Sequence, residues 1–344
     1  MPASTRWPKW SPLRLALRLP VRPSALALLL AAACGGSGHE DGPESPGGPG
    51  SGATGPSGPV APLRVGSMQT DASAYIEYTP GDAPLVIIAP HGGTLRPAEL
   101  PDRRCSGCET TNDLETQALA RLIVERFHAA TGARPHLVVN RLHRVKFDAN
   151  RDIDEATDGT AALRAPWTWM HAAVDSAEAM IARQGTRGLV IDLHGHAHAI
   201  ARLELGYLLD GAALRNADSV LSFTGAMERT SVARLARETH SLSDRGVPLL
   251  RGPRSLGTLL TGEGYAAVPS VGDRAPGPGE PYFDGGYNTQ RHGSSNGGAI
   301  DAIQIEAPNA GVRDTDMNRA RFADALVRVL RVYLATHYGW QSTP

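Results

Sequence analysis

The sequence predicts a single α/β domain in which helices flank a mainly parallel mixed sheet. A continuous apolar run, LVIIA at 85–89, and a similar run, LVIDL at 189–193, have the length and composition of strands that are buried on both faces. Apolar residues recur at helical spacing at 119–127 and 322–333, between and after these runs. Strands that alternate with helices are typical of an α/β fold. We therefore expect one such domain at residues 63–344.

Other elements follow from the same patterns. Segments 136–139, 203–209 and 299–306 have the composition of strands, and the first helix is expected to open near Asp113. Residues 243–298 are rich in Gly, Pro and Asp, a composition that predicts long surface loops.

Residues 1–33 are expected to be an export signal. A basic stretch without acidic residues precedes a short apolar run, Ala25 to Ala33, that ends in small residues. This run falls well short of the ~20 residues that span a bilayer as a helix, so we expect cleavage rather than a permanent span. The next residue is Cys34, and the segment resembles the lipobox of bacterial lipoproteins, in which that cysteine receives a lipid. Simple secretion is the alternative.

The chain beyond the signal is expected to begin as a tether. Residues 34–62 are almost entirely Gly, Pro, Ser and Ala, which cannot bury enough apolar surface to fold, so we expect them to be disordered. Membrane contact is expected only through a lipid on Cys34. The expected location is the bacterial envelope, periplasmic or anchored to the outer membrane.

The charge balance excludes one class of partner. The chain has 34 Lys and Arg against 35 Asp and Glu, which gives a formal net charge of -1. A nucleic-acid-binding protein needs a basic stripe or patch, so no nucleic-acid partner is expected.

Polar side chains occur at the ends of three predicted strands. His91 and His194 follow the two apolar runs, and Glu306 ends the last strand. Because ligands of α/β sheets bind beyond the carboxyl ends of the strands, we expect these three residues to converge. Zinc hydrolases use three protein ligands and leave one position open for water. His91 and His194 would supply two nitrogen ligands to one Zn²⁺ ion.

The third ligand is expected to be a carboxylate. Asp113, at the start of the next predicted helix, is the best placed acid near His91, and Glu115 and Glu99 are the alternatives. Asp113 could instead only cap the helix, since NDLET is a good helix opening.

His194, His196 and His198 form an H-x-H-x-H run. The metallo-β-lactamase pattern H-x-H-x-D-H is excluded, because His198 stands where Asp is required and Ala199 where His is required. We therefore expect His196 and His198 to be pocket groups that support the site.

The segment 140–155 mixes basic and acidic residues, including Arg144, Asn150 and Arg151. Most of the segment is expected to be a solvated loop with salt bridges. Its functional interpretation is carboxylate recognition, because Arg offers a planar fork of donors and Asn adds another donor.

Two further motifs are given structural roles. Gly293 to Gly297 matches G-x-S-x-G, yet a loop precedes it and a strand follows, which is the wrong context for a nucleophile elbow. Cys105 and Cys108 form a C-x-x-C without a second pair, and in an exported protein they predict a small disulfide.

Taken together, the motifs resemble the N-formylglutamate amidohydrolase-like family over residues 84–335. The family is similar in fold to zinc carboxypeptidases, which are phosphorylase/hydrolase-like, and to the phage poly-γ-glutamate hydrolases. The motifs are PHGG at 90–93, NDLET at 112–116, NRLHR at 140–144, DANRDIDEA at 148–156, IDLHGH at 191–196 and AIQIE at 302–306.

This resemblance implies a role for each matching residue. His91, Asp113 and His194 would bind one zinc ion, and Glu306 would act as the general base. Asn150 and Arg151 would hold a substrate carboxylate, with Arg144 assisting. The chain departs from carboxypeptidases at Thr94, which stands where they carry a glutamate ligand, so the acid must come from further along the chain.

We therefore expect a metal-dependent hydrolase that cleaves an amide or peptide bond next to a free carboxylate. An N-acyl amino acid, a peptide or a γ-glutamyl polymer suits an exported enzyme. The alternative is a surface-anchored binding protein on a hydrolase fold that has lost its activity.

Overall fold

The computed structural model describes residues 57–239 and 243–342, and these residues form the predicted α/β domain. The predicted export signal, Cys34 and the tether up to residue 56 lie outside the described residues, so they stay predictions. Within the described ranges, none of the helices is both long enough and apolar enough to cross a membrane.

The described residues form an eight-stranded mixed sheet with the strand order β1-β2-β4-β3-β5-β8-β6-β7. Its centre is parallel, since β4, β3, β5 and β8 run in one direction. Strand β2 pairs antiparallel with β4, and β6 pairs antiparallel with β8. The strands are β1 (Gln69–Thr70), β2 (Ile76–Thr79), β3 (Leu85–Ala89), β4 (His136–Asn140), β5 (Leu189–His196), β6 (Leu203–Gly206), β7 (Ala267–Val268) and β8 (Asp301–Pro308).

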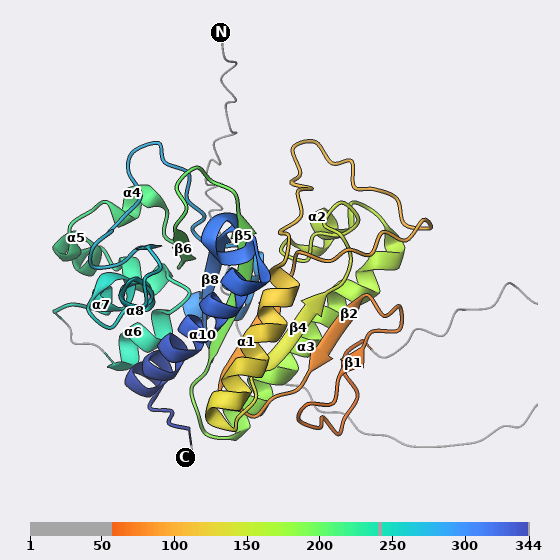
Figure 1. Ribbon diagram of the computed structural model, residues 1–344, viewed down its shortest axis with the longest axis horizontal. Helices are drawn as coiled ribbons and strands as arrows, with labels where there is room; N and C mark the ends of the chain where they lie inside the picture. The colour runs from red at the N-terminus through yellow and green to blue at the C-terminus, as the bar shows by residue number, and fades with distance from the viewer. Residues whose placement is uncertain (1–56, 240–242, 343–344) are drawn as a thin grey trace, which may run out of the picture. The chain divides into compact units, whose positions relative to one another are not determined.

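Helices cover both faces of this sheet (Figure 1). The α-helices are α1 (Thr116–Thr131), α2 (Ile153–Thr157), α3 (Arg164–Arg183), α4 (Gly211–Leu214), α5 (Asp218–Phe223), α6 (Ala233–Thr239), α7 (Val247–Arg251), α8 (Leu256–Gly262), α9 (Tyr287–His292) and α10 (Asp316–Tyr333). Shorter helical turns are η1 (Ala161–Leu163), η2 (Ala226–Arg229), η3 (Ser294–Asn296), η4 (Asn309–Arg313) and η5 (Leu334–Tyr338).

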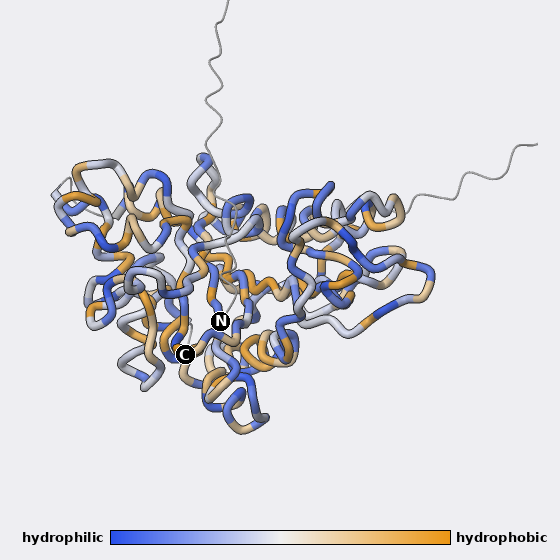
Figure 2. The backbone as a smooth tube through the Cα atoms, turned by 90° about the horizontal axis from the view of Figure 1, so that it is seen from above, coloured by the Kyte–Doolittle hydropathy of each residue, from blue (hydrophilic) through white to orange (hydrophobic). Residues whose placement is uncertain are grey.

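The core lies in two layers, one on each side of the sheet. Leu85 and Ile87 of β3 pack with α1 and α10, whereas Val86 and Ile88 pack with α3. Alternate residues of a strand point to opposite faces, so a strand buried on both faces must be apolar throughout. Figure 2 colours the chain by residue hydropathy, and hydrophobic segments run through the interior of the domain among hydrophilic ones. The continuous apolar run at 85–89 is thereby explained.

The prediction of long surface loops at 243–298 is right for residues 269–286, which form neither helix nor strand, and wrong for much of the rest. This segment contains α7, α8, β7 and α9, and leucines of the first two helices, such as Leu250 and Leu260, are buried in the core. Pro248 stands in the first turn of α7, and the Ser255 side chain caps α8. Proline and serine therefore start short helices here rather than preventing them.

Strand β5 is longer than its apolar run predicts. It continues to His196 because β8 pairs with it residue by residue as far as His196 opposite Pro308. In this register His194 lies beside Glu306. The partner strand therefore extends regular structure into the polar residues that matter most.

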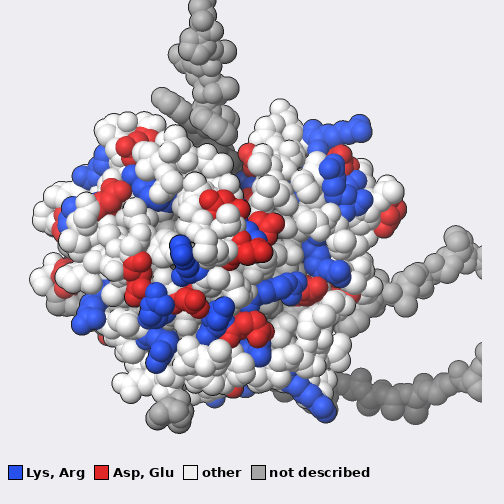
Figure 3. All heavy atoms as spheres, viewed as in Figure 1, with Lys and Arg blue, Asp and Glu red and all other residues white. Residues whose placement is uncertain are grey.

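The face shown in Figure 3 carries basic and acidic side chains intermixed. Many of them form pairs, such as Arg126 of α1 with Asp324 of α10 at 3.5 Å and Arg328 of α10 with Glu263 at 2.7 Å. Exposed pairs of this kind contribute little to stability, about 0 to 1 kcal/mol each. This range does not apply to the charged side chains that are buried at the carboxyl edge of the sheet.

Candidate metal centre

Three side chains from three segments meet at the carboxyl edge of the parallel strands. The Nδ1 atom of His91 lies 3.2 Å from Oδ2 of Asp113 and 3.2 Å from Nδ1 of His194. Asp113 Oδ2 also lies 3.2 Å from His194 Nδ1, which closes the triangle. All three residues are buried. The structure thus brings together the three residues that the sequence proposes as ligands.

The chain reaches this arrangement through two close turns. His91 follows β3 by two residues, and Gly92 after it has a φ of +88°. A Cβ atom at Gly92 would lie 2.3 Å from the Thr116 hydroxyl, so only glycine lets the turn pack against the start of α1. Asp113 lies three residues before α1, and its carboxylate accepts a hydrogen bond from the Gly195 N–H at 3.1 Å. The Asp113 side chain therefore points to the site and does not cap the helix.

Two further carboxylates set the protonation of the histidines. His91 Nε2 lies 2.7 Å from Asp148 Oδ1, and His194 Nε2 lies 3.1 Å from Asp192 Oδ2. A carboxylate only accepts hydrogen bonds, so a proton on each Nε2 would satisfy Asp148 and Asp192 and leave a lone pair on each Nδ1 for a metal ion. Carboxylates that orient histidine ligands in this way are common around metal ions.

The triangle fits a zinc ion. Ligand atoms at Zn–N and Zn–O distances of ~2.1 Å in a tetrahedron are roughly 3.3 Å apart, close to the separations found here. Lone pairs that face one another at such distances repel unless a cation lies among them. Burial by itself would lower the pKa of His194. Asp192 and Asp113 instead hold this pKa well above its usual value, so positive charge is favoured at this position. His91, Asp113 and His194 would hold zinc and leave the fourth position open.

Asp148 and Asp192 were not among the predicted site residues. Asp148 belongs to the mixed charged segment, and Asp192 interrupts an otherwise apolar strand. An acid within a buried strand is the signal that could have identified Asp192, since an unpaired charge is rarely buried. For Asp148 the sequence holds no comparable signal, because its neighbours are charged too.

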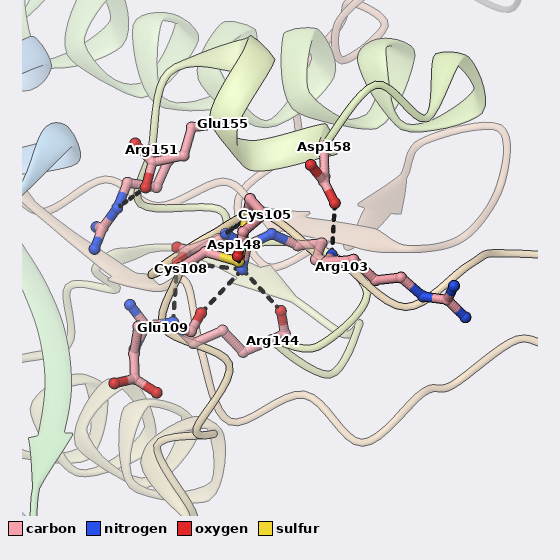
Figure 4. Close-up of a disulfide and its surroundings, with 10 residues drawn as sticks. Arg103, Cys105, Cys108, Glu109, Arg144, Asp148, Arg151, Glu155 and Asp158 are labelled. Atoms are coloured by element: carbon pink, nitrogen blue, oxygen red, sulfur yellow. Dashed lines mark hydrogen bonds and ion pairs between the residues drawn. A yellow bond between two sulfur atoms is a disulfide. The ribbon is translucent and has the colours of Figure 1, made fainter.

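Arginines hold Asp148 in place (Figure 4). Arg144 donates from Nε to Asp148 Oδ2 at 3.0 Å and lies 3.6 Å from Asp113. Arg103 lies 3.6 Å from Asp148 and donates to the carbonyl oxygens of Glu109 and Arg144. Arg144 is thus next to the site, as expected, but its charge is already paired with two carboxylates.

The disulfide predicted between Cys105 and Cys108 is confirmed, with the Cα atoms 5.5 Å apart. It closes a turn between Arg103 and Glu109 (Figure 4). The same loop continues to Asp113. The disulfide therefore constrains the chain that leads into one of the candidate ligands.

Glu306 is buried on β8 beside His194. Its Oε1 accepts a hydrogen bond from Gln304 at 3.0 Å, while Oε2 has no hydrogen-bond partner among the described residues. Burial raises the pKa of Glu306 to about 8, although charge on His194 opposes the shift. A carboxyl group with such a pKa can both take up and release a proton near neutral pH.

A pocket of about 360 Å³ opens beside the three residues. Asp113, Arg144, Arg313, His198 and Phe283 are among the residues that line it. The rings of His198 and Phe283 stack with their centroids 4.9 Å apart. This volume is enough for a small molecule or the end of a chain.

His196 and His198 also line this pocket, as predicted from the sequence. They lie near Glu204, but their ring nitrogens already have protein partners. His196 uses Nε2 with the Arg202 carbonyl and Nδ1 with the His198 N–H, and His198 Nδ1 lies 2.9 Å from Glu204. This group is better satisfied without a metal than the His91 triangle is.

Asn150 and Arg151 are placed differently from each other. Asn150 is buried, accepts a hydrogen bond from the Asn288 N–H at 2.8 Å, and its Nδ2 lies 3.2 Å from Nε2 of His194. Arg151 pairs with Glu155 at 2.8 Å and is not among the residues that line the pocket. The alternative acids are elsewhere, with Glu115 3.5 Å from Arg319 and Glu99 exposed and bonded to Tyr75.

No family model matches this sequence, and no curated protein does. Among solved structures, a gene product of Agrobacterium tumefaciens is 16% identical, with a TM-score of 0.42 over 76% of this chain and 95% of its own. The N-acetylmuramyl-L-alanine amidase of Mycobacterium smegmatis is 14% identical, with a TM-score of 0.29 over 73% of this chain and 97% of its own. Succinylglutamate desuccinylase of Chromobacterium violaceum is 11% identical, with a TM-score of 0.33 over 79% of this chain and 67% of its own. These likenesses are distant, and the function proposed below rests on the geometry of the site.

Proposed function

We propose that this protein is a zinc-dependent hydrolase that cleaves an amide or peptide bond next to a free carboxylate. The observation that carries the proposal is the triangle of His91 Nδ1, Asp113 Oδ2 and His194 Nδ1, with 3.2 Å between each pair of atoms. Each histidine is oriented by a carboxylate, and the buried Glu306 lies on the neighbouring strand.

Zinc bound by these residues would supply a Lewis acid that polarises a carbonyl group and makes water more acidic. Glu306 would take a proton from the attacking water through its unpartnered Oε2 and pass it to the nitrogen of the leaving amine. The charge that develops on the carbonyl oxygen requires nearby cationic or N–H donors. A zinc ion held by His91, Asp113 and His194 would supply that positive charge.

The substrate class and the location belong to the same proposal. A pocket of about 360 Å³ with two arginines suits an acylated amino acid, the end of a peptide or a γ-glutamyl unit. The export signal would place this activity in the bacterial envelope, anchored through a lipid on Cys34. A variant with Cys34→Ser should then leave the membrane fraction of cells, whereas continued membrane attachment of that variant would exclude the anchor.

The test of the activity is a hydrolysis screen with zinc-loaded protein. Purified protein would be freed of metal by chelation, reloaded with one equivalent of zinc, and incubated with N-acyl amino acids, dipeptides and γ-glutamyl peptides. Release of free amine that depends on zinc supports the proposal. If the protein binds no zinc and hydrolyses nothing after zinc is added, the alternative of a binding protein on an inactive fold is favoured.

A further inference from the structure

Arg313 is a buried cation without an acidic partner of its own. It ends the turn η4 after β8, and only 3% of its surface is exposed. Among the described residues no carboxylate oxygen lies within ion-pairing distance of it. Its nearest acidic neighbours, Asp113 and Glu306, act only through longer-range charge. A buried charge that is not paired is costly, so its position needs an explanation.

Backbone carbonyl groups hold the guanidinium in place. Its Nε donates to the Ala307 carbonyl and Nη2 to the His196 carbonyl, each at 3.0 Å, and Nη1 donates to the Leu114 carbonyl. An arginine has five N–H donors, so one on each terminal nitrogen is left over. Because the residue lines the pocket, these donors are available to a bound molecule.

Gly195 makes room for this arrangement. A Cβ atom at Gly195 would lie 2.3 Å from Cζ of Arg313, so any larger residue would displace the guanidinium. Gly195 directly follows His194, and Leu114 directly follows Asp113. Arg313 is therefore held against the backbone next to two of the three candidate ligands.

The other arginines near the site are less suited to bind an anion. Arg144 is paired with Asp148 and Asp113, and Arg151 is paired with Glu155 outside the pocket. A substrate carboxylate at either residue would compete with a carboxylate that is already there. The guanidinium of Arg313 keeps one N–H on Nη1 and one on Nη2, and a carboxylate can accept a hydrogen bond from each.

We propose that Arg313 binds the carboxylate of the substrate and that this contact selects N-acyl α-amino acids and peptide C-termini. This inference rests on the proposed function for the position of the amide bond. In such substrates one carbon atom separates the carboxylate from the amide nitrogen. A carboxylate on Arg313 would therefore bring the amide to the edge of the triangle formed by His91, Asp113 and His194.

The test compares two probes that differ only in charge. N-acetylglycine carries the carboxylate, and N-acetylglycinamide replaces it with a neutral amide. Their dissociation constants are measured by titration calorimetry on the zinc-loaded Glu306→Gln variant, which prevents turnover. We expect at least a roughly tenfold preference for N-acetylglycine, since a charged hydrogen-bonded pair contributes about 1.5–3 kcal/mol.

Three variants on this background identify the residue responsible. Arg313→Met should reduce the preference to about one while N-acetylglycinamide still binds. Arg328→Met, the same change at an exposed ion pair on α10, should keep the full preference. Arg151→Met tests the other candidate arginine and should keep the full preference. If the preference is lost in this variant, Arg151 binds the carboxylate and the proposal is overturned.

Other outcomes are equally decisive. A purely structural role for Arg313 would weaken both probes equally and leave their ratio unchanged, which would overturn the proposal. If Arg313→Met does not fold, Gly195→Ala serves instead, because it displaces the guanidinium and should abolish the preference. If the preference depends on Arg313 but no substrate is hydrolysed by the parent enzyme, the anion site stands and the proposed function fails.

Discussion

The Nδ1 atoms of His91 and His194 lie 3.2 Å apart, and Asp113 Oδ2 lies 3.2 Å from each of them. On the opposite side of each ring, Nε2 lies next to a carboxylate, which is Asp148 for His91 and Asp192 for His194. A cation held among these two atoms and the Asp113 carboxylate would stabilise the arrangement. The arrangement leads to separate predictions for the ligands, for the carboxylates behind them and for Glu306.

Replacing a candidate ligand should remove the metal. We expect His194→Ala to lose stoichiometric zinc, because only two donors of the triangle would remain. Zinc content is measured by elemental analysis after dialysis. His198→Ala is the matched control, since this histidine lies in the same pocket but outside the triangle, and it should keep one zinc ion. A His194→Ala protein that retains a full equivalent would exclude this residue as a ligand.

Replacing an orienting carboxylate should weaken zinc binding without abolishing it. Asp192→Asn should lower zinc affinity by roughly 10 to 100-fold, because the amide no longer fixes the Nε2 proton of His194 as strongly. Competition with a chromophoric chelator measures the affinity. Asp324→Asn, at an exposed acid that pairs with Arg126, should have no effect on the same measurement. Unchanged affinity in Asp192→Asn would show that Asp192 serves only the fold.

Glu306 should affect the rate and not the metal content. Glu306→Gln should retain zinc and lose about 10² to 10⁴ in kcat, because the amide can neither take nor donate the required proton. Steady-state kinetics on the best substrate of the screen, with zinc content measured in parallel, tests this. Gln304→Glu is not a suitable control, since Gln304 contacts Glu306 directly. Equal activity of Glu306→Gln and the parent enzyme would remove Glu306 from the mechanism.

A histidine remote from the site should make stability depend on pH. Burial lowers the pKa of His136 to about 4, and its Nδ1 accepts a hydrogen bond from the Gly81 N–H at 3.0 Å. The unfolded chain, with a pKa of about 6.5, then binds more protons than the folded chain between pH 4 and 6.5. The stability that neutral His136 provides is therefore complete above pH 6.5 and is lost as the pH falls toward 4.

His136→Asn keeps an acceptor near the position of Nδ1 but does not titrate. Between pH 7 and 4 the unfolding free energy of the parent should fall by about 3 kcal/mol more than that of the variant. Urea unfolding at a series of pH values measures both. Parallel pH profiles for the two proteins would show that His136 does not carry this dependence.

Much of the fold could be predicted because its strands are buried on both faces. The run at 85–89 corresponds to β3 residue for residue, and the helical face of Phe322, Leu326 and Leu330 packs in the core as expected. The segment 243–298 could not be predicted in this way. Its helices are only five to seven residues long, so tertiary packing rather than periodicity stabilises them.

The candidate site, like the fold, could be predicted only in part. Histidines at strand ends could be recognised as site residues from the sequence, because the carboxyl edge of a parallel sheet is where such residues meet. Asp148 and Arg313 were missed, since nothing in their local sequence distinguishes a buried, oriented charge from a solvated one. Asp192 was missed although its place within an apolar strand was a signal. Arg151, which local sequence favoured, lies in an ion pair outside the pocket, and its predicted role stays a prediction.

By itself, the sequence determined the α/β class, the buried central strands and the side chains that stand at their carboxyl ends. These features depend on apolar runs and strand ends, which are local properties of a chain. Only the tertiary structure decided which acid completes the triangle, which carboxylates orient the histidines and which arginine remains unpaired. Those outcomes depend on distances between residues as far apart as Leu114 and Arg313, and such distances exist only once the sheet has formed.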